Sequence, residues 1–473
     1  MKKYTAMILA ILLALSVLLT ACGGGANTNT NTNTDSPSQT TETGNKTDSK
    51  SETTPPVTAV DKSGYEFSER DQDPSYDEVT ATVTLADSGS TADGSGVTVE
   101  GSSITVTAAG TYVISGNFSS GSVTVAAGEE DKVQLVLSGV SVTNPDGPAI
   151  YVKSADKVFL TLAEGTENTL SDGSDAAATD DDKNLDGAVF SRADLTINGS
   201  GSLTVHGNSK HGVVSKDDLV ITGGTVTVAA RNVALNGKDC VKITAAAVNL
   251  TAGTDGIRSD NDEDADRGYV YIQSGTITVD AGTDGIQAKT DLYVAGGTLT
   301  ISSGNDGARA DETLTVNGGT LVITAAEGLE ATVVTINDGD ISISASDDGI
   351  NAAQKSSAYT PLVEINGGKT TIVMGTGDTD GVDSNGNIVI NGGTVSVTGN
   401  SAFDYEGSGD INGGTVIVNG QQVTTLPNQM MGGMMGPGGQ PGGQPGGTPP
   451  GGQPGGQPGG TPPGGQPGGF GHP

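Results

Sequence analysis

Two consecutive stretches decide the fold, and they read GTITVDAGTDGIQAKTDLYVAG (residues 275–296) and GTLTISSGNDGARADETLTVNG (residues 297–318). Each is 22 residues long, opens with Gly-Thr and carries an Asp-Gly pair near its middle. Within each stretch Val, Ile or Leu alternates with Thr, which is the two-residue period of a β-strand. A repeat of this length with two or three short strands is typical of one coil of a parallel β-helix.

The same pattern continues on both sides, because small-residue steps recur from Gly201 to Gly414 and the alternation fills about residues 79–420. Propeller blades need about 40 residues or more, and leucine-rich repeats need a leucine ladder that is missing here. We therefore predict an all-β fold, a parallel β-helix with about 22 residues per coil over residues 97–426, preceded by an N-terminal cap region at 61–96. In each strand the aliphatic residues should point inward and the threonines outward.

Two coils are longer than the others by about seven residues. One insertion contains the acidic run Ser259-Asp260-Asn261-Asp262-Glu263-Asp264, and the other contains Gln354-Lys355-Ser356-Ser357. Insertions in a solenoid form loops, and such loops often mark the working face. We expect both to lie beside the functional site.

The two ends of the chain do not share the repeat. Two lysines and a short apolar run precede Leu19-Thr20-Ala21-Cys22-Gly23, which resembles the bacterial lipobox. We predict a signal peptide at 1–21 and a lipid anchor on Cys22 that holds the protein on the extracellular face of the bacterial membrane. Residues 22–60 are predicted to be a disordered polar linker, and 427–473 a disordered Gly/Pro/Gln-rich tail.

Charge and aromatic content limit the partners. The 473-residue chain has 22 Lys and Arg against 56 Asp and Glu, a net charge of −34, which excludes nucleic acid as a partner. Trp is absent and aromatic residues make up 3% of the chain, which argues against a flat aromatic platform for sugars. Tyr269, Tyr271 and Tyr293 remain as stacking candidates, although a structural role is favoured for them.

An acidic motif keeps the period of the coils. Its members are Asp255-Gly256, Asp284-Gly285, Asp306-Gly307, Glu327-Gly328, Asp348-Gly349 and Asp380-Gly381. A single Asp-Gly pair is explained by turn formation, because Gly takes positive φ. As a series, however, the carboxylates would stack at ~4.8 Å and repel one another. Since Lys and Arg are too scarce to compensate, we predict bound Ca²⁺, which takes 6–8 oxygen ligands.

The predicted calcium ligands come from this ladder and its surroundings. They are Asp255, Asp260, Asp262, Asp284, Asp306, Asp348, Asp380 and Asp383. The coil of Glu327 departs from the Asp-Gly pattern and is left out of the metal set.

Several motifs are also specific to a family. Gly110-Thr111-Tyr112-Val113-Ile114-Ser115-Gly116, Asp194-Leu195-Thr196-Ile197-Asn198-Gly199 and Asp255-Gly256-Ile257 resemble the clostridial polygalacturonate-binding β-helix lipoproteins, a family of carbohydrate-binding domains. The resemblance spans roughly residues 97–420. It implies a right-handed parallel β-helix similar to pectate lyases, bound Ca²⁺ and binding of acidic plant polysaccharide at a cell surface, with cellulose as a further partner.

Three functions remain open at this stage. The leading one is a surface protein that binds polygalacturonate or a similar glycan, with Ca²⁺ bridging carboxylates on both partners. The second is a calcium-dependent lyase that acts by β-elimination, which needs a basic side chain to remove the α-proton of a uronate. Arg258, Lys289 and Arg309 are the candidate bases, although the chain has no distinctive base motif. The third is a structural adhesin in which the ladder only stiffens a rod.

Overall fold

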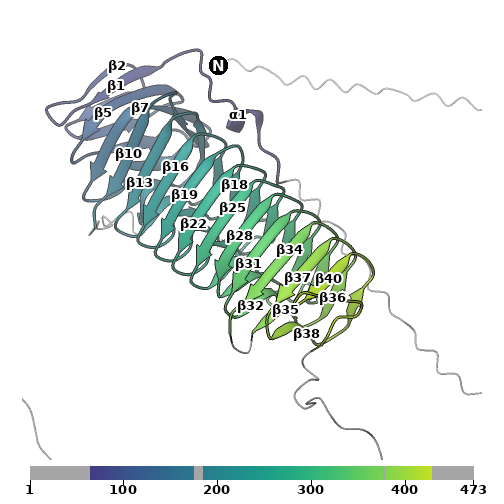
Figure 1. The fold of residues 1–473 in the computed structure, drawn as a ribbon. Helices are drawn as coiled ribbons and strands as arrows, with labels where there is room; N and C mark the ends of the chain where they lie inside the picture. Colours follow the sequence, from purple (N-terminus) through teal and green to yellow (C-terminus); the bar gives the residue numbers. More distant parts are fainter. Residues whose placement is uncertain (1–63, 175–184, 377–378, 429–473) are drawn as a thin grey trace, which may run out of the picture. The chain divides into compact units, whose positions relative to one another are not determined.

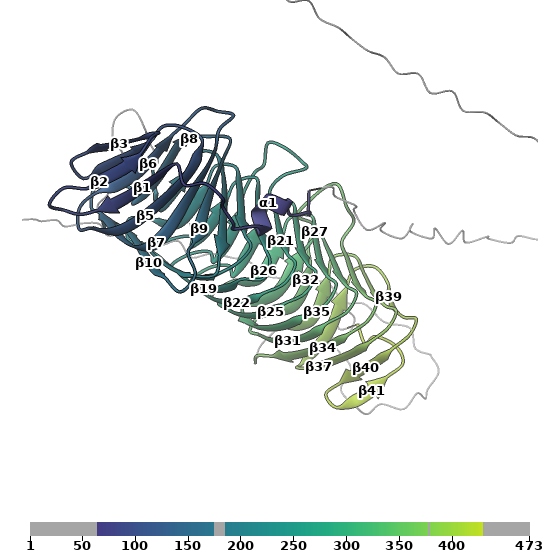
Figure 2. The same ribbon diagram turned by 90° about the horizontal axis from the view of Figure 1, so that it is seen from above.

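The computed structural model describes residues 64–174, 185–376 and 379–428. The predicted signal peptide, the lipidation site Cys22, the linker and nearly all of the tail lie outside these residues. The described residues form a solenoid of short strands (Figures 1 and 2). Within them, α1 (Glu69–Gln72) is the one helix, and no helix is long and apolar enough to cross a membrane. The prediction of an all-β parallel β-helix is confirmed.

Three stacks of strands make up the solenoid, and each coil contributes one strand to each stack. The first stack, sheet B, has 14 strands. They are β3 (Val97–Glu100), β4 (Ser103–Val106), β6 (Ser122–Ala126), β8 (Ile150–Ser154), β11 (Gly187–Ser191), β14 (His211–Ser215), β17 (Leu235–Gly237), β20 (Ile257–Ser259), β23 (Ile286–Ala288), β26 (Asp306–Ala310), β29 (Glu327–Ala331), β32 (Asp348–Ala352), β35 (Asp380–Ser384) and β38 (Ser401–Tyr405).

The other two stacks, A1 and A2, belong to one sheet of 27 strands. Stack A1 contains β9 (Lys157–Leu162), β12 (Asp194–Gly199), β15 (Asp218–Ile221), β18 (Cys240–Ile243), β21 (Tyr269–Ile272), β24 (Asp291–Val294), β27 (Thr313–Val316), β30 (Val333–Ile336), β33 (Leu362–Ile365), β36 (Asn387–Ile390) and β39 (Gly409–Ile411). Stack A2 contains β10 (Glu167–Asp172), β13 (Ser202–Gly207), β16 (Thr225–Ala230), β19 (Ala247–Ala252), β22 (Thr276–Ala281), β25 (Thr298–Ser303), β28 (Thr320–Ala325), β31 (Asp340–Ala345), β34 (Lys369–Met374), β37 (Thr394–Thr398) and β40 (Thr415–Val418), with β41 (Gln421–Val423) antiparallel to β40.

At the N-terminal end the two A stacks merge. The long strand β7 (Lys132–Asn144) pairs with both β9 and β10. It also pairs with β5 (Gly110–Phe118), which pairs in turn with β1 (Ala81–Leu85). Strand β1 pairs antiparallel with β2 (Thr91–Gly94). The sheet therefore begins within the region expected to form the cap.

The alternation in the sequence is reproduced by the packing. In β22, Ile277 and Val279 are buried while Thr276 and Thr278 are exposed. Parallel pairing places Ile277 beside Leu299 of the next coil, so apolar residues stack on apolar residues. The result is one continuous apolar core that runs through the solenoid. It needs few aromatic side chains, because each coil fills the same cross-section with Val, Ile and Leu.

Residues 64–80 form a strap that crosses the outer side of stack A1. Near its start, the Tyr65 ring packs on the rings of Tyr269, Tyr271 and Tyr293, with centroids 5.2, 5.0 and 5.2 Å apart. Only 3% of Tyr269 and 8% of Tyr271 is exposed. These tyrosines therefore cover a structural contact, as the sequence favoured, and do not form a platform for sugar rings.

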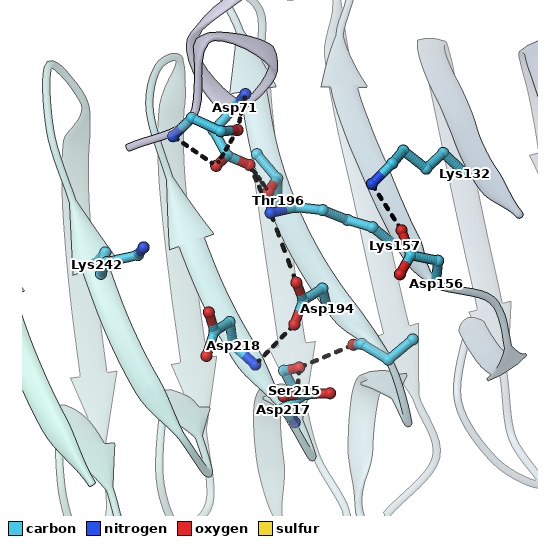
Figure 3. A network of polar contacts seen from close by, with 12 residues as sticks. Asp71, Lys132, Asp156, Lys157, Asp194, Thr196, Ser215, Asp217, Asp218 and Lys242 are labelled. Carbon is cyan, nitrogen blue, oxygen red and sulfur yellow. Dashed lines mark hydrogen bonds and ion pairs between the residues drawn. The ribbon is translucent and has the colours of Figure 1, made fainter. Parts of the chain in front are cut away.

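Further along the strap, Asp71 anchors α1 to the strands below it. Its carboxylate lies 2.8 Å from Nζ of Lys157 and accepts a hydrogen bond of 2.6 Å from Thr196 (Figure 3). Burial opposes ionisation of Asp71, but its hydrogen bonds to Lys157, Thr196 and Ser68 together lower its pKa below the usual range. The strap is thus fixed to A1 by an aromatic cluster at one point and by a buried ion pair at another, which leaves sheet B uncovered by it.

Candidate functional site

The predicted acidic ladder forms one column on sheet B, called here the acidic column. Strand pairing places Asp306 beside Glu327 and Asp348 beside Asp380. Adjacent strands of a sheet are ~4.8 Å apart, so the side chains of neighbouring coils repel one another at close range. The members of the column are Asp255, Asp284, Asp306, Glu327, Asp348 and Asp380.

The explanation of the Asp-Gly pairs as turns is wrong. The positive-φ glycines of the described residues do not include the glycines of these pairs. Instead, each such glycine faces the core where there is no room for a side chain. A Cβ atom on Gly307 would overlap Cγ2 of Ile323 and the carbonyl oxygen of Gly328. The pair therefore marks the entry into sheet B, with the glycine inward and the acid outward.

A second column, called here the mixed column, lies three residues further along each sheet B strand. Its members, in coil order, are Arg258, Gln287, Arg309, Glu330, Asn351, Asp383 and Asp404. The charge along this column changes from basic to acidic toward the C-terminal end. The predicted ligand Asp383 therefore lies beside the acidic column and not within it.

Acids of the two columns come together near the middle of the acidic column. Carboxylate oxygens of Asp306, Glu327 and Glu330 lie within 4.8 Å of one another. Oδ2 of Asp306 is buried without a hydrogen-bond partner. Burial in the first place, and then the Glu330 carboxylate, raise the pKa of Asp306 to about 8. Two cations contact the group, since Nζ of Lys355 lies 2.6 Å from Glu330 and Nε of Arg309 lies 3.7 Å from Asp306.

Toward the C-terminal end, acid accumulates without such cations. Among the described residues, no Lys or Arg forms an ion pair with Asp348 or Asp383. Burial, followed for Asp383 by the Asp380 carboxylate, raises the pKa of Asp348 to about 7 and that of Asp383 to about 6. One oxygen of Asp404 is also buried without a hydrogen-bond partner. An added cation at this end of sheet B would therefore meet carboxylates that no Lys or Arg of the described residues already offsets.

The two predicted insertions flank a groove beside these columns. They form the loops 260–268 and 353–361, and with the side chains between them they enclose about 420 Å³. The floor includes Lys289 and Asp311, whose charged groups are 2.7 Å apart. Asp262 lines the groove, whereas Asp260 lies 3.3 Å from Arg258. Both insertions therefore form loops, as expected, and the second loop reaches the acidic residues of sheet B through the contact of Lys355 with Glu330.

The three candidate bases are all held by carboxylates. Arg258 lies 3.3 Å from Asp255, Arg309 hydrogen-bonds Asp311 at 3.1 Å, and Lys289 pairs with Asp311. The hydrogen bond to Asp311 raises the pKa of Lys289. Burial lowers the pKa of Arg309, but Asp311 and the neighbouring acids outweigh it and raise the pKa overall. A base must first be deprotonated, so these partners oppose proton abstraction by Lys289 and Arg309.

Comparisons with known proteins identify the family of this chain. A family model described as "Carbohydrate-binding domain-containing protein" matches residues 100–307 and 302–428. The chain belongs to this carbohydrate-binding family. A relative with the same description, from Acetivibrio thermocellus, is 42% identical over 125 residues, which are 26% of this chain and 44% of the relative. The chain thus spans less than half of that relative.

One solved structure is also similar to this carbohydrate-binding protein. It is described as a polysaccharide lyase-like protein from C. thermocellum in a gadolinium derivative. The two share 34% identity over 52% of this chain and 94% of the other, with a TM-score of 0.44.

A second group of carboxylates in this carbohydrate-binding protein was not anticipated from the sequence. Asp194, Asp217 and Asp218 have carboxylate oxygens within 4.8 Å of one another, near the junction of sheet B and stack A1 (Figure 3). Burial, and then the Asp194 carboxylate, raise the pKa of Asp217 to about 6. Lys157 lies 3.8 Å from Asp194 and connects this group to the strap. The signal in the sequence is an Asp at the start of two successive A1 strands, Asp194 and Asp218, which lie one coil of the solenoid apart.

The sequence analysis also left out two members of the central group. Glu327 breaks the Asp-Gly pattern and was left out of the metal set, and Glu330 is not among the predicted ligands. Their longer side chains bring both carboxylates to Asp306, which spacing alone does not reveal.

Proposed function

We propose that this protein binds acidic plant cell-wall polysaccharide, such as polygalacturonate, through Ca²⁺ held by the carboxylates of sheet B. We further propose that it does so on the extracellular face of a bacterial cell, anchored through a lipid on Cys22. The substrate class is the one that the resemblance to polygalacturonate-binding proteins implies, and the charge of the chain is the reason for including calcium. A strongly acidic protein and a polyuronate repel each other unless a divalent cation lies between them.

The observation that carries this proposal is the buried carboxylate group of Asp306, Glu327 and Glu330. All its ligand atoms are oxygens, which suits a hard cation such as Ca²⁺. The Asp306 oxygen without a hydrogen-bond partner offers a coordination position inside the group. When bound, Ca²⁺ would supply two positive charges and open coordination positions for uronate oxygens.

The protein's own cations set the limits of this site. Lys355 and Arg309 already offset part of the central charge, so Glu330 must serve them as well as a metal ion. Asp348 and Asp383 have no such competitor among the described residues. We therefore place the stronger calcium effect on the C-terminal half of sheet B, with the groove between the insertion loops as the neighbouring space for a sugar chain.

The test is binding of the full chain to polygalacturonate and to cellulose, with calcium and with EDTA. We expect calcium removal to weaken polygalacturonate binding by ~10-fold or more, a typical coupling between two ligands. The double substitution Asp348→Asn and Asp383→Asn should remove most of the calcium effect. Its matched control is Asp77→Asn with Asp280→Asn, two exposed acids away from sheet B.

Two results would contradict the proposal. Polygalacturonate binding of equal strength in calcium and in EDTA would refute the bridging role of the ion. No binding to any polysaccharide, together with stabilisation by calcium, would instead favour the structural adhesin. For the anchor, Cys22→Ser should move the protein from the membrane fraction to the medium, and retention of that variant in the membrane fraction would contradict lipidation at Cys22.

A further inference from the structure

The N-terminal half of sheet B carries a strip of cations, called here the basic strip, that the acidic ladder does not use. Lys153 is the next-to-last residue of β8, and Arg192 and Lys216 directly follow β11 and β14. The backbone N–H of Arg192 donates to Val152 at 3.0 Å, and that of Lys216 donates to Ser191 at 2.8 Å. The three cations therefore occupy the same position in successive coils, ~4.8 Å apart along the solenoid.

All three side chains of the strip are exposed. The next coil continues it with Lys238, whose Nζ lies 3.1 Å from Glu263, an acid with 78% of its side chain exposed. A surface pair of this kind contributes little and leaves Lys238 able to exchange partners. The strip thus runs along one edge of sheet B over four coils.

Two of these cations have no carboxylate partner within the described part of the chain, although the chain is rich in acidic residues. With 56 acidic and 22 basic residues, carboxylates are available throughout the molecule. Lys132 pairs with Asp156 at 2.6 Å and Lys210 pairs with Asp186 at 2.8 Å. By contrast, Lys153 and Lys216 form no ion pair with a carboxylate among the described residues. Balancing the protein's own charge therefore does not explain their place.

Two aromatic side chains, Tyr151 and Phe190, contact the cations of the strip. Nζ of Lys216 lies 5.4 Å and the Arg192 guanidinium 5.8 Å from the centre of the Phe190 ring. Nε of Arg192 also donates to the Tyr151 hydroxyl at 3.1 Å. Phe190 is 1% exposed, so its ring cannot stack on a sugar. Its role is to attract the cations and restrict their positions, which reduces the entropy lost when they bind an anion.

We propose that the basic strip binds the carboxylates of an acidic polysaccharide directly, without calcium. This inference rests on the proposed function and extends it to a second subsite. One polyuronate chain along sheet B would meet ammonium and guanidinium groups at the N-terminal half and metal-binding carboxylates at the C-terminal half. A repeating carboxylate polymer fits a strip that repeats one cation per coil, because each coil then contributes an equivalent contact.

The test uses the full chain in EDTA, where calcium bridging is absent, and measures polygalacturonate binding. Lys153→Glu with Lys216→Glu reverses the two cations that lack carboxylate partners. The matched control, Lys132→Glu with Lys369→Glu, makes the same change of net charge at exposed lysines on the 27-stranded sheet. Thermal melting of both variants checks that they fold.

If the strip binds uronate, the wild type retains binding in EDTA that weakens with added salt. The strip variant then loses at least ~10-fold in affinity, and the control changes by no more than about twofold. Equal affinity of the two variants for polygalacturonate in EDTA would overturn the inference that the basic strip binds uronate. The inference would also be overturned if the wild type bound polygalacturonate only with calcium and the strip variant bound it equally well with calcium. That result would leave the proposed function intact.

Two further outcomes separate the inference from its basis. A wild type that binds no polygalacturonate in either condition overturns the proposed function, and the strip with it. Stronger binding of inorganic polyphosphate than of polygalacturonate in EDTA, lost in the strip variant, would overturn the assignment to carboxylated sugars.

Discussion

The substitution Asp306→Asn tests the electrostatic account of sheet B most directly. It removes one charge from the central carboxylate group and keeps the size of the side chain. The pKa of Asp306 is raised to about 8 from a usual 3.8, by burial first and then by Glu330 and Asp284. The folded state therefore holds this proton more tightly than the unfolded state does. Stability from this group is fully present below about pH 4 and is lost as the pH rises through about 8.

The size of the effect follows from that difference. Each tenfold change in proton affinity is ~1.4 kcal/mol, so ionising Asp306 in the folded protein costs up to ~6 kcal/mol without a metal. The amide of Asn is neutral, but it also needs a hydrogen-bond partner in the same buried place. We therefore expect Asp306→Asn to stabilise the protein by ~3 kcal/mol at pH 8.5 in EDTA, where no metal is bound. For a chain of this size that is ~5 °C in Tm.

The assay is thermal melting in EDTA at pH 5 and at pH 8.5, followed by melting at pH 8.5 with calcium. At pH 5 the penalty for Asp306 shrinks to ~1.7 kcal/mol, which is less than the ~3 kcal/mol cost of the amide, so the variant should melt about 2 °C below the wild type. With calcium the wild type should gain stability and the variant should gain less. Asp280→Asn, an exposed substitution on β22, is the control. A variant that melts below the wild type in EDTA at pH 8.5 would refute the reasoning.

Three other predictions concern packing and chemistry. Gly307→Ala should lower the free energy of unfolding by ~2 kcal/mol or more, because its Cβ overlaps Ile323. A Cβ on Gly147 would make only an ordinary contact, 3.6 Å from the Asn144 side chain, so Gly147→Ala should change stability little, and equal denaturant midpoints for the two variants would contradict this. Tyr65→Ala should cost ~1–3 kcal/mol by uncovering the tyrosine cluster, with Tyr76→Ala, at an exposed position, as the comparison in thermal melts. Incubation with polygalacturonate and calcium should release no unsaturated uronide, and its appearance in the absorbance spectrum would establish a lyase.

The sequence predicted the fold well because each coil of a parallel β-helix solves the same packing problem. A period of 22 residues with alternating Val, Ile and Thr leaves little choice about which side chains point inward. The same period predicted the acidic column, since equal spacing in the chain becomes equal position in the sheet. The glycine after each acid was misread, because Asp-Gly in a turn and Asp-Gly at a strand entry have the same sequence. The backbone angles of these glycines, none of which has positive φ, and contacts such as that of Gly307 with Ile323 distinguish them.

What the sequence could not supply are contacts between residues far apart in the chain. Lys355 lies in the second insertion, and nothing periodic predicts that it reaches Glu330 in the preceding coil. The strap is a stronger case, since Tyr65 packs on Tyr269 across about 200 residues. Both contacts depend on the direction of a loop or strap after the solenoid has formed. The spacing of residues in the sequence therefore does not predict how these contacts change the charge and exposure of the side chains.

Sheet B also shows how a solenoid can vary its charge along one axis. Each coil adds one residue to every column, so the choice at one position, repeated or changed from coil to coil, sets a profile of charge along the sheet. Here the profile changes from Lys153 and Lys216 at one end to Asp348 and Asp383 at the other. Without a bound cation the acidic end is destabilising at neutral pH, because its pKa values of about 7 and 6 show that the folded state resists ionisation. A neutral Asn would fit the same strand position without this cost. The carboxylates are therefore consistent with the proposed binding of a cation. Under the proposed function, a divalent cation would neutralise the acidic end and an anionic polymer would pair with the basic end, and neither would do both alone.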